Sequence, residues 1–357
     1  MKKILITTGG SGGHVIPALN LFDHLKNLHK TFLVTDERGK KFIDNDKYEY
    51  HLLNIPQKKS LLSIPITMVQ FFVSIIKSLF YLKKIKVDVL ISTGGYMSLP
   101  FCISAKIIGI DIYLFEPNMV IGRANRFFLK FCKKIVSYNY NIINFPEKHK
   151  KKIYLINPIL NKNIYNYKRN NNLNQSKTLN LLVLGGSQGA KFFDKFVVDL
   201  VLKLSNFVKI SVYQQVYEPK KIEQINKIYL KANIKNEVFS YDPHIYKKML
   251  NCNLAITRCG ASTLAELTQL NLPFIGIPFP FAKDNHQYYN CQNMLNKNCC
   301  WLLDQKNIQI EKVIDLLKKI LTDEKEYNDK ILNMNNISCK NSWNDINKKL
   351  TTLFNEY

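Results

Sequence analysis

The sequence predicts an α/β protein with two domains, each built on a parallel sheet that helices cover on both faces. The chain of 357 residues is long enough for two domains of ordinary size. Its 46% hydrophobic and 22% charged residues are typical of a globular protein, which excludes a disordered chain. In both halves, short apolar runs alternate with helical patterns, and a glycine-rich loop follows the first run.

The alternation places strands at regular intervals along the chain. We expect them at 3–8, 31–35, 88–92, 111–115 and 134–137 in the first half, and at 180–184, 208–213, 253–257 and 273–277 in the second. Strands that alternate with helices favour open parallel sheets. Residues 161–178 are polar and are predicted to be a linker, which divides the chain into domains 1–160 and 161–341. The segment 342–357 is predicted to contain a helix that packs back on the first domain.

The two glycine-rich loops are Gly9–His14 (GGSGGH) and Gly185–Ala190 (GGSQGA). Glycine allows a tight turn and a close approach of a ligand, and the free N–H groups at the start of the next helix favour an anion. Ligands of open α/β sheets bind beyond the carboxyl ends of the strands. Three further polar clusters fall at such ends: 92–96 (STGGY), 116–118 (EPN) and 258–266 (RCGASTLAE). We therefore expect one cleft to collect all five segments.

Composition narrows the class of partner. The net charge of +24 predicts attraction to nucleotide phosphates, acidic lipids or nucleic acid, although runs such as Asn170–Asn172 indicate that a biased genome contributes to it. Nucleic acid is disfavoured because the basic run Lys148–Lys152 has no interleaved aromatic residues. The eight cysteines contain no CxxC pair, which indicates reduced thiols rather than a zinc site or a disulfide framework. The first residues lead directly into a strand, so no signal peptide is expected.

The apolar segment 61–82 has three interpretations. It is nearly long enough to span a bilayer, but Pro65, Gln70 and Lys77 interrupt it. Lysines flank it at 58–59 and at 83–84, so charge does not define an orientation. An interfacial helix, partly core and partly at an anionic lipid surface, and an ordinary core helix are the other two interpretations.

Three residues are candidates for chemistry. His14 closes the first loop, and an imidazole with an ordinary pKa of about 6.5 suits a general base; alternatively the ring only hydrogen-bonds the backbone. Glu266 can accept both hydroxyls of a ribose, or it can complete a helix-capping box with Thr263. Gln287 is predicted in the first turn of a helix capped by Asp284, where its amide reads sugar hydroxyls or is simply solvated.

Two familiar motifs match the loops only weakly. A dinucleotide fingerprint requires a third small residue where the first loop has Val15, although Asp36 resembles the ribose-binding acid of that motif. The second loop reads G-x-S-x-G, as in α/β-hydrolases, with Asp242, His244 and His286 downstream. Neither interpretation explains both loops together with Thr263 and Glu266.

Taken together, the motifs GGSGGH, STGGY, EPN, GGSQGA, RCGASTLAE and DNHQ (284–287) resemble those of the MurG family, in its order and spacing, over nearly the whole chain. The resemblance implies a GT-B fold, two Rossmann-like domains facing a central cleft. It implies an inverting transfer of N-acetylglucosamine from UDP-GlcNAc to the 4-hydroxyl of the muramoyl group of undecaprenyl-pyrophosphoryl-MurNAc-pentapeptide (lipid I), which forms lipid II. It implies no cofactor and no metal, and a peripheral location on the cytoplasmic face of the bacterial inner membrane, with 61–82 on the lipid.

The resemblance also implies roles for individual residues. In the first half, it assigns Ser11, Gly12 and Gly13 to the acceptor and donor phosphates, His14 to the base and Asn118 to a sugar. In the second half, it assigns Ser187 to the donor pyrophosphate and Gln287 to the N-acetylglucosamine hydroxyls. It assigns uridine and phosphate to Ala261, Ser262, Thr263, Leu264, Ala265 and Glu266, with Glu266 on the ribose. Tyr96 and Glu116 fall on the acceptor side. At Asp242 the family uses the backbone on uracil, so that side chain matters little.

The sequence departs from the family pattern at three places: Leu160 replaces an arginine, Pro117 replaces a glutamine, and the turn 213–216 reads YQQV. Loss of one charged hydrogen bond costs about 1.5–3 kcal/mol, which weakens an enzyme without abolishing it. A related diacylglycerol glycosyltransferase and a degenerate, non-catalytic membrane-binding homologue remain as alternatives. The complete GGSGGH followed by Pro17 favours the muramoyl acceptor.

Overall fold

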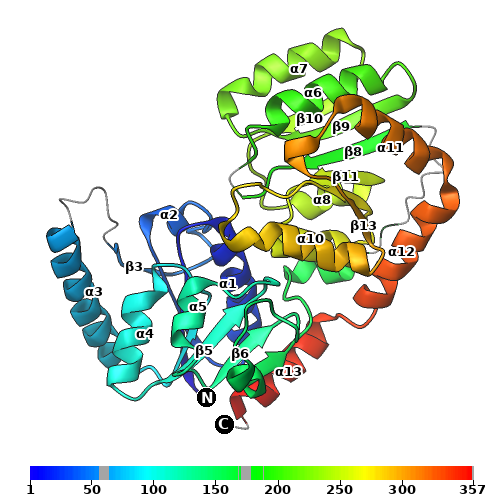
Figure 1. Cartoon of the computed structure of the whole chain (residues 1–357). Helices are drawn as coiled ribbons and strands as arrows, with labels where there is room; N and C mark the ends of the chain where they lie inside the picture. Colours follow the sequence, from blue (N-terminus) through cyan, green and yellow to red (C-terminus); the bar gives the residue numbers. More distant parts are fainter. Residues whose placement is uncertain (56–63, 168, 170–177, 188, 356–357) are drawn as a thin grey trace. The chain divides into compact units, whose positions relative to one another are not determined.

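The computed structural model describes all residues except 56–63, 168, 170–177, 188 and 356–357 (Figure 1). The chain forms two compact units: unit 1 contains residues 1–162 and 343–357, and unit 2 contains residues 163–342. The division therefore follows Lys162, where the sequence led us to expect it after Leu160. Half of the expected linker 161–178, namely 168 and 170–177, lies outside the described residues; of the rest, Lys162–Asn166 form a 3-10 helix.

Unit 1 is built on a seven-stranded sheet of order β3-β2-β1-β4-β5-β6-β7, and all its strand pairs are parallel. The strands are β1 Lys3–Thr7, β2 Lys30–Thr35, β3 His51–Leu52, β4 Val89–Ser92, β5 Asp111–Glu116, β6 Lys134–Ser137 and β7 Ile153–Leu155. The helices are α1 Gly12–Leu25, α2 Glu37–Lys40, α3 Ile64–Ile85, α4 Ser98–Ile107, α5 Arg123–Phe128 and the 3-10 helix Glu147–Lys152. Successive residues of β1 alternate between two cores: Ile4 and Ile6 pack on one face and Leu5 on the other. Helices therefore cover both faces of the sheet.

Unit 2 repeats this plan with a six-stranded parallel sheet of order β10-β9-β8-β11-β12-β13. Its strands are β8 Thr178–Leu184, β9 Lys209–Gln215, β10 Lys235–Phe239, β11 Leu254–Thr257, β12 Phe274–Gly276 and β13 Cys300–Leu302. Its α-helices are α6 Phe193–Leu204, α7 Ile222–Lys231, α8 Ile245–Asn251, α9 Ala261–Gln269, α10 His286–Asn296, α11 Ile310–Thr322 and α12 Glu324–Ser338. Three 3-10 helices lie between them, at Pro219–Lys221, Lys283–Asn285 and Gln305–Asn307.

All nine predicted strands are present, and four more were not predicted: β3, β7, β10 and β13. Three of these have only two or three residues, and the edge strand β10 (KNEVF) carries charged residues. Such strands lack the continuous apolar run of a strand that is buried on both faces. Pairing with a neighbouring strand forms them instead.

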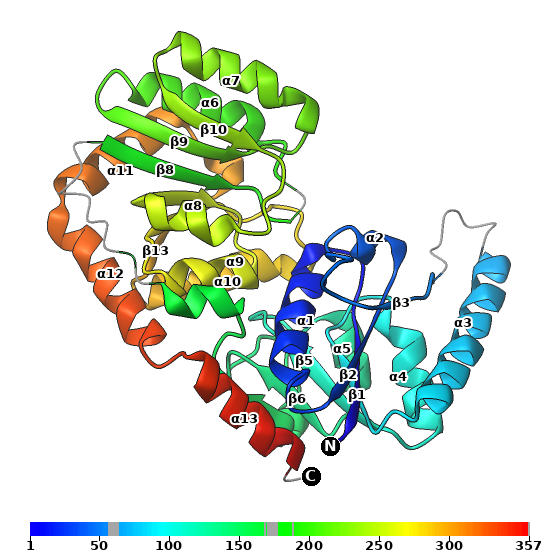
Figure 2. The same ribbon diagram turned by 180° about the vertical axis from the view of Figure 1, so that it is seen from behind.

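The last helix, α13 Trp343–Asn355, belongs to unit 1 and contacts α1 (Figure 2). The ring of Trp343 stacks on His24 with centroids 3.5 Å apart, and Phe354 packs edge-on against Tyr113. Burial lowers the pKa of His24 to about 4, so the stacked imidazole is neutral at physiological pH. These contacts explain why the chain returns to its first unit.

A group of buried thiols packs inside unit 2 around Gly276. The Sγ atoms of Cys291 and Cys300 are 3.9 Å apart, and a Cβ atom on Gly276 would lie 2.2 Å from Sγ of Cys291 and 2.9 Å from Sγ of Cys259. All eight cysteines of the chain are free thiols, and only Cys339 is exposed. The space at position 276 therefore admits glycine alone unless a thiol moves.

This packing predicts that Gly276→Ala destabilises unit 2 by about 1–3 kcal/mol through overpacking. Because the closer of the two sulfurs belongs to Cys291, the double variant with Cys291→Ala should be more stable than the sum of the two single effects. Thermal unfolding of the four proteins measures this coupling. Gly260→Ala is the matched control, since a Cβ atom there meets nothing within 4 Å. An unchanged melting temperature for Gly276→Ala would contradict the packing.

Candidate functional site

Asp36 holds the first glycine-rich loop in place. Its Oδ1 accepts hydrogen bonds from the backbone N–H groups of Gly10, at 2.9 Å, and Gly39, at 2.8 Å, while Arg38 donates to Oδ2. Burial opposes ionisation of this carboxyl, but the hydrogen bonds outweigh it and lower its pKa. Gly10 has φ +82°, which only glycine adopts readily. Asp36 thus serves the loop itself, which removes the residue that favoured dinucleotide binding.

His14 is the third residue of α1, and its Nδ1 lies 2.8 Å from the carbonyl oxygen of Thr93. A carbonyl can only accept, so Nδ1 carries the proton, and in the neutral ring Nε2 holds the lone pair. Gly94 and Gly95 have φ +86° and +80°, and a Cβ atom on either would lie 3.5 Å from the imidazole ring. The STGGY motif therefore packs against His14 and fixes the orientation of its ring. With Nδ1 bonded to Thr93, Nε2 is the nitrogen that could accept a proton, so the base role of His14 stays a prediction.

Glu116 organises the loop after β5. Its Oε1 accepts from the backbone and side-chain N–H groups of Asn118, and its Oε2 accepts from the backbone of Gly122 and from Nδ2 of Asn125. The carboxylate is buried, so its hydrogen-bonding capacity is used within the loop. Glu116 thereby sets the position of Asn118, and a direct contact of either with substrate stays a prediction.

The second glycine-rich loop is held in a similar way by Gln215, the last residue of β9. Its Oε1 accepts from the backbone N–H of Gly185 at 3.0 Å, and its Nε2 donates to the carbonyl of Ser240 at 2.8 Å. Gly186 and Gly189 have φ +81° and +71°. Ser187 lies in the turn between them, at the carboxyl end of β8. The YQQV turn therefore supports this loop even though it departs from the family pattern.

Glu266 lies in the second turn of α9, and the helix begins differently from the capping-box prediction. The residue before α9 is Gly260, so Thr263 is the third helical residue, and the capping box of Thr263 with Glu266 is wrong. Among the described residues no donor or cation contacts the Glu266 carboxylate, and burial raises its pKa to about 7. Burial raises the pKa of Tyr241, and the negative charge of the nearby Glu266 raises it further. A half-buried carboxylate without a partner is suited to a ligand that brings hydroxyl donors.

Gln287 is in the first turn of α10, as expected, and one end of its amide is already used. Oε1 accepts from the backbone N–H groups of Cys259, at 3.2 Å, and Phe279, at 2.9 Å. Both partners only donate, so the orientation of the amide is unambiguous, and Nε2 is the end that remains for a ligand. Gln287 can thus donate to a sugar oxygen but does not accept from a sugar hydroxyl.

The predicted cap of α10 by Asp284 is wrong. The helix begins at His286 after Asn285, and Asp284 belongs to the preceding 3-10 turn. Asp284 and Asn285 have φ 53° and 52°, the left-handed region, which aspartate and asparagine tolerate better than most residues. The chain therefore makes a sharp turn just before the helix that carries Gln287.

Arg258 supports the same segment and was not predicted. Its guanidinium is buried over the ring of Phe193 and donates to the carbonyls of Ile277 and Pro278 and to Oε1 of Gln305. Burial lowers its pKa to about 10, so it remains a cation at neutral pH. A charged residue directly after a buried strand was the feature of the sequence from which its role could have been predicted. Because Arg258 binds the carbonyls of residues 277 and 278, it helps to position the N–H group of Phe279, which donates to Gln287.

Helix α3 exposes most of its large apolar side chains. Among the described residues, Pro65–Ile85 is the one helix long and apolar enough to cross a membrane by length and composition, and 17% of its most apolar window is buried. We call the exposed set the α3 apolar face: Ile66, Met68, Val69, Phe72, Val73, Ile76 and Phe80. The buried stripe contains Ser74 and Ser78, and Ser104 of α4 donates to the carbonyl of Ile75. An ordinary core helix is therefore wrong for this segment; residues 61–63 lie outside the described part.

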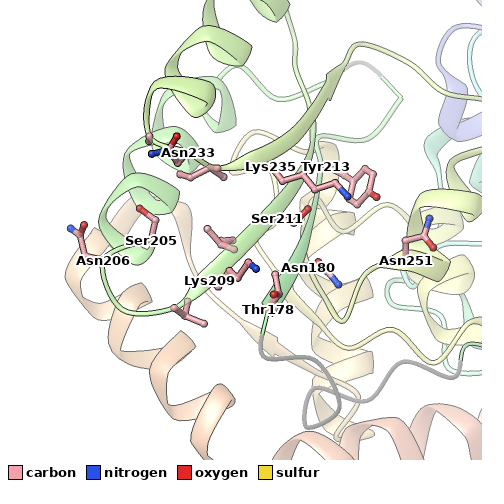
Figure 3. Close-up of a pocket in the computed structure, with 14 residues that line it drawn as sticks. Thr178, Asn180, Ser205, Asn206, Lys209, Ser211, Tyr213, Asn233, Lys235 and Asn251 are labelled. Carbon is pink, nitrogen blue, oxygen red and sulfur yellow. The ribbon is translucent and has the colours of Figure 1, made fainter.

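A separate hollow of about 970 Å³ lies in unit 2 at the amino ends of β8, β9 and β10 (Figure 3). Its polar lining includes Asn180, Ser211, Tyr213 and Lys235. None of the predicted site residues lines it, because they follow the carboxyl ends of the strands. We therefore do not assign this hollow to the site.

Asp242 is not available as the acid that the α/β-hydrolase interpretation requires. Asp242 accepts from the backbone N–H of His244 and forms an ion pair with Lys248, and these contacts outweigh its burial and lower its pKa. Its carboxylate therefore fixes the start of α8 and is not available to orient a catalytic histidine. Within the described ranges, no group of three or more His, Cys, Asp or Glu side chains could hold a metal ion.

Leu160, which replaces the family arginine, is buried in unit 1. No polar side-chain contact to a donor can come from this position. In the donor segment 258–266 the charged residues are Arg258 and Glu266.

Comparison with known proteins agrees with this geometry. The N-terminal domain of glycosyltransferase family 28 matches residues 4–137, and the C-terminal domain of that family matches residues 180–350. A Pelagibacter ubique protein, named UDP-N-acetylglucosamine--N-acetylmuramyl-(pentapeptide) pyrophosphoryl-undecaprenol N-acetylglucosamine transferase, is 45% identical over 99% of both chains. A Rickettsia canadensis protein of the same name is 34% identical over 91% of this chain and 92% of its own.

Among solved structures, Acinetobacter baumannii MurG superposes with a TM-score of 0.76 over the full length of both chains, at 20% identity. This likeness shows the GT-B fold, with two Rossmann-like domains. The matches cover both units and leave no large part of the chain unaccounted for. From its two matched domains, its relatives and its fold, the chain belongs to glycosyltransferase family 28 and, within it, to the MurG family.

Proposed function

We propose that this enzyme transfers N-acetylglucosamine from UDP-GlcNAc to the 4-hydroxyl of the muramoyl group of lipid I, forming lipid II for the bacterial cell wall. The observation that carries the proposal is the 45% identity, over 99% of the chain, to a relative named for this reaction. Three residues support it: His14 has an oriented ring, and among the described residues no donor contacts the Glu266 carboxylate and no acceptor contacts Nε2 of Gln287.

Unit 2 is proposed to bind the donor. The Glu266 carboxylate accepts the two ribose hydroxyls, and Nε2 of Gln287 donates to an oxygen of the N-acetylglucosamine. The free N–H groups at the start of α9, from Ala261 to Thr263, and the turn at Ser187 bind the diphosphate. Negative charge grows on that diphosphate as the glycosidic bond breaks, and the positive end of α9 stabilises it.

Unit 1 is proposed to bind the acceptor and supply the base. Nε2 of His14 takes the proton of the muramoyl 4-hydroxyl while the oxygen attacks the anomeric carbon and the bond to UDP breaks, which inverts that carbon. The hydrogen bond from Nδ1 to Thr93 stabilises the imidazolium that forms, since the proton donor stays aligned with a carbonyl. The N–H groups of the loop at Ser11–Gly13 lie at the start of α1, where they suit the acceptor diphosphate.

The membrane contact is proposed to be the α3 apolar face, on the cytoplasmic leaflet of the inner membrane. An exposed apolar surface of this size on one helix is typical of an interaction site. Lys77, Lys83 and Lys84 lie on or near its carboxyl-terminal half, which suits anionic headgroups. Peripheral attachment through this face agrees with the packing of its serine stripe against α4.

The direct test is transfer of radiolabelled N-acetylglucosamine from UDP-GlcNAc to a lipid I analogue, with diacylglycerol as the comparison acceptor. We expect product with the lipid I analogue alone. Product with diacylglycerol alone would identify the related lipid glycosyltransferase activity. Donor binding without transfer to either acceptor would identify a non-catalytic homologue.

His14→Ala is expected to lower kcat by about 10²–10⁴-fold, the usual contribution of a general base. UDP affinity should stay the same, because His14 belongs to unit 1 and the donor residues to unit 2. Steady-state kinetics and titration calorimetry measure the two effects separately. Turnover close to that of the unsubstituted enzyme would rule out His14 as the base.

Donor binding should depend on pH through Glu266. Its pKa of about 7 in the free protein lies above the ordinary value of 4.5, and the ribose hydroxyls bind the ionised form. Affinity for UDP-GlcNAc should therefore be full above pH 7 and fall as the pH drops through 7, by at most about tenfold per unit. Calorimetry from pH 5.5 to 8.5 tests this. Glu266→Gln should bind weakly with no such slope, and a flat profile in the unsubstituted protein would contradict the assignment.

A further inference from the structure

We propose that Tyr96 is a specificity-determining residue that aligns the long apolar chain of the acceptor with the His14 loop, since Tyr96 contacts α3 and its neighbours in sequence pack on that loop. The inference rests on the proposed function and deepens its acceptor side. It concerns the order in which the parts of an amphipathic acceptor lie along unit 1.

The contacts of Tyr96 join two parts of unit 1. Its ring centroid lies 5.8 Å from that of Phe71 on α3, with the ring planes tilted by 34°. Its two neighbours in sequence both touch the first glycine-rich loop: Gly95 lies against the His14 ring, and the Cβ of Met97 is 3.0 Å from where a Cβ on Gly9 would be. One residue therefore contacts the apolar helix while its backbone is packed on the loop that carries the base.

The junction is held by hydrogen bonds on both sides. After Tyr96 the chain enters α4 at once, with Leu99 N–H donating to the carbonyl of Tyr96 and Ser98 Oγ donating to that of Gly95. Further along α4, Ser104 Oγ donates to the carbonyl of Ile75 in α3 at 2.9 Å. These bonds fix α3, Tyr96 and the loop relative to one another within unit 1.

The α3 apolar face continues from this junction. Met68, Phe72 and Ile76 are spaced by four residues, so they share one side of the helix, next to the side that bears Phe71. Their exposed fractions are 68%, 64% and 42%. An apolar chain on this face would remove their surface from water, at a gain proportional to the area covered.

The order of chemistry along unit 1 matches the order of chemistry in the acceptor. Phe71 of α3 contacts Tyr96, and the neighbours of Tyr96 in sequence pack on the loop that carries the backbone N–H groups at the start of α1 and the His14 ring. The acceptor runs from a polyprenyl chain, through its first linkage, to a diphosphate and then a sugar hydroxyl. Tyrosine, with an apolar ring and a polar end, suits the boundary between apolar chain and diphosphate. Its side chain is 40% exposed, and burial of the rest raises the pKa of its hydroxyl, which keeps it protonated as a donor.

The test uses two lipid I analogues with the same head group, one carrying a long polyprenyl chain and one a short, water-soluble chain. The readout is the ratio of kcat/KM for the long-chain to that for the short-chain acceptor, in detergent micelles. Tyr96→Ala should lower this ratio about tenfold, as should Phe71→Ala, which removes the ring contact from the α3 side. Tyr96→Phe, which keeps the ring, should retain most of the ratio.

Phe207→Ala is the matched control. Phe207 is an aromatic residue of unit 2, 61% exposed, and belongs to neither α3 nor the donor segments. It should leave the ratio unchanged, and UDP-GlcNAc binding by each variant checks that it is folded. A full ratio in Tyr96→Ala, or an equal loss in Phe207→Ala, would overturn the proposal. Absence of transfer to both acceptors by the unsubstituted enzyme would instead contradict the proposed function.

Discussion

Each glycine-rich loop is held by one side-chain oxygen from the end of the neighbouring strand. In unit 1, Asp36 follows β2 and accepts from Gly10; in unit 2, Gln215 ends β9 and accepts from Gly185. Each partner strand lies beside the strand that precedes the loop, since β2 pairs with β1 and β9 with β8. A glycine loop by itself has many conformations, and this bond restricts them. In unit 1 the restricted loop leads directly into α1. In unit 2 it holds the turn at Ser187, and the start of α9 supplies the other N–H groups proposed for the donor diphosphate. The proposed binding of two diphosphates depends on these loop conformations.

The same plan gives the two units different chemistry because their fourth strands, β4 and β11, end differently. After β4, the carbonyl of Thr93 and the small surfaces of Gly94 and Gly95 seat a histidine. After β11, the buried Arg258 and the start of α9 support a carboxylate and an amide. Burial shifts the pKa of Glu266 upward and that of Arg258 downward. Protein oxygens replace the lost hydration of Arg258, whereas the hydroxyls of a ligand can replace that of Glu266. In the proposed function, unit 1 therefore supplies the proton acceptor and unit 2 binds the nucleoside diphosphate sugar.

The α3 apolar face is exposed because only a narrow stripe of the helix packs against unit 1. Ser74 and Ser78 lie in this buried stripe, and their small side chains allow α3 and α4 to approach closely. The side chains of the α3 apolar face are then directed outward, where much of their surface is exposed. A helix of this composition costs free energy in water, and that cost is recovered when a lipid surface or an apolar chain covers the face. The contact between Phe71 and Tyr96 connects that surface to the seat of His14.

From the sequence alone we predicted the two-unit α/β plan, nine of the strands and the motif residues at their carboxyl ends. These are recorded in local patterns: apolar runs for buried strands, glycines for tight loops, and residue order for the family. Short or edge strands such as β3 and β10 were not predictable, because pairing with a neighbour creates them. Helix starts were also misjudged at Thr263 and Asp284, since the first helical residue depends on backbone angles that several residue types can adopt. Four features became known only from the tertiary structure. They are the tautomer of His14, the end of the Gln287 amide that remains for a ligand, the hydrogen bonds by which Asp36 and Gln215 hold the loops, and the exposure of the apolar side chains of α3. Each of these depends on a partner distant in sequence, and such partners meet only when the chain has folded.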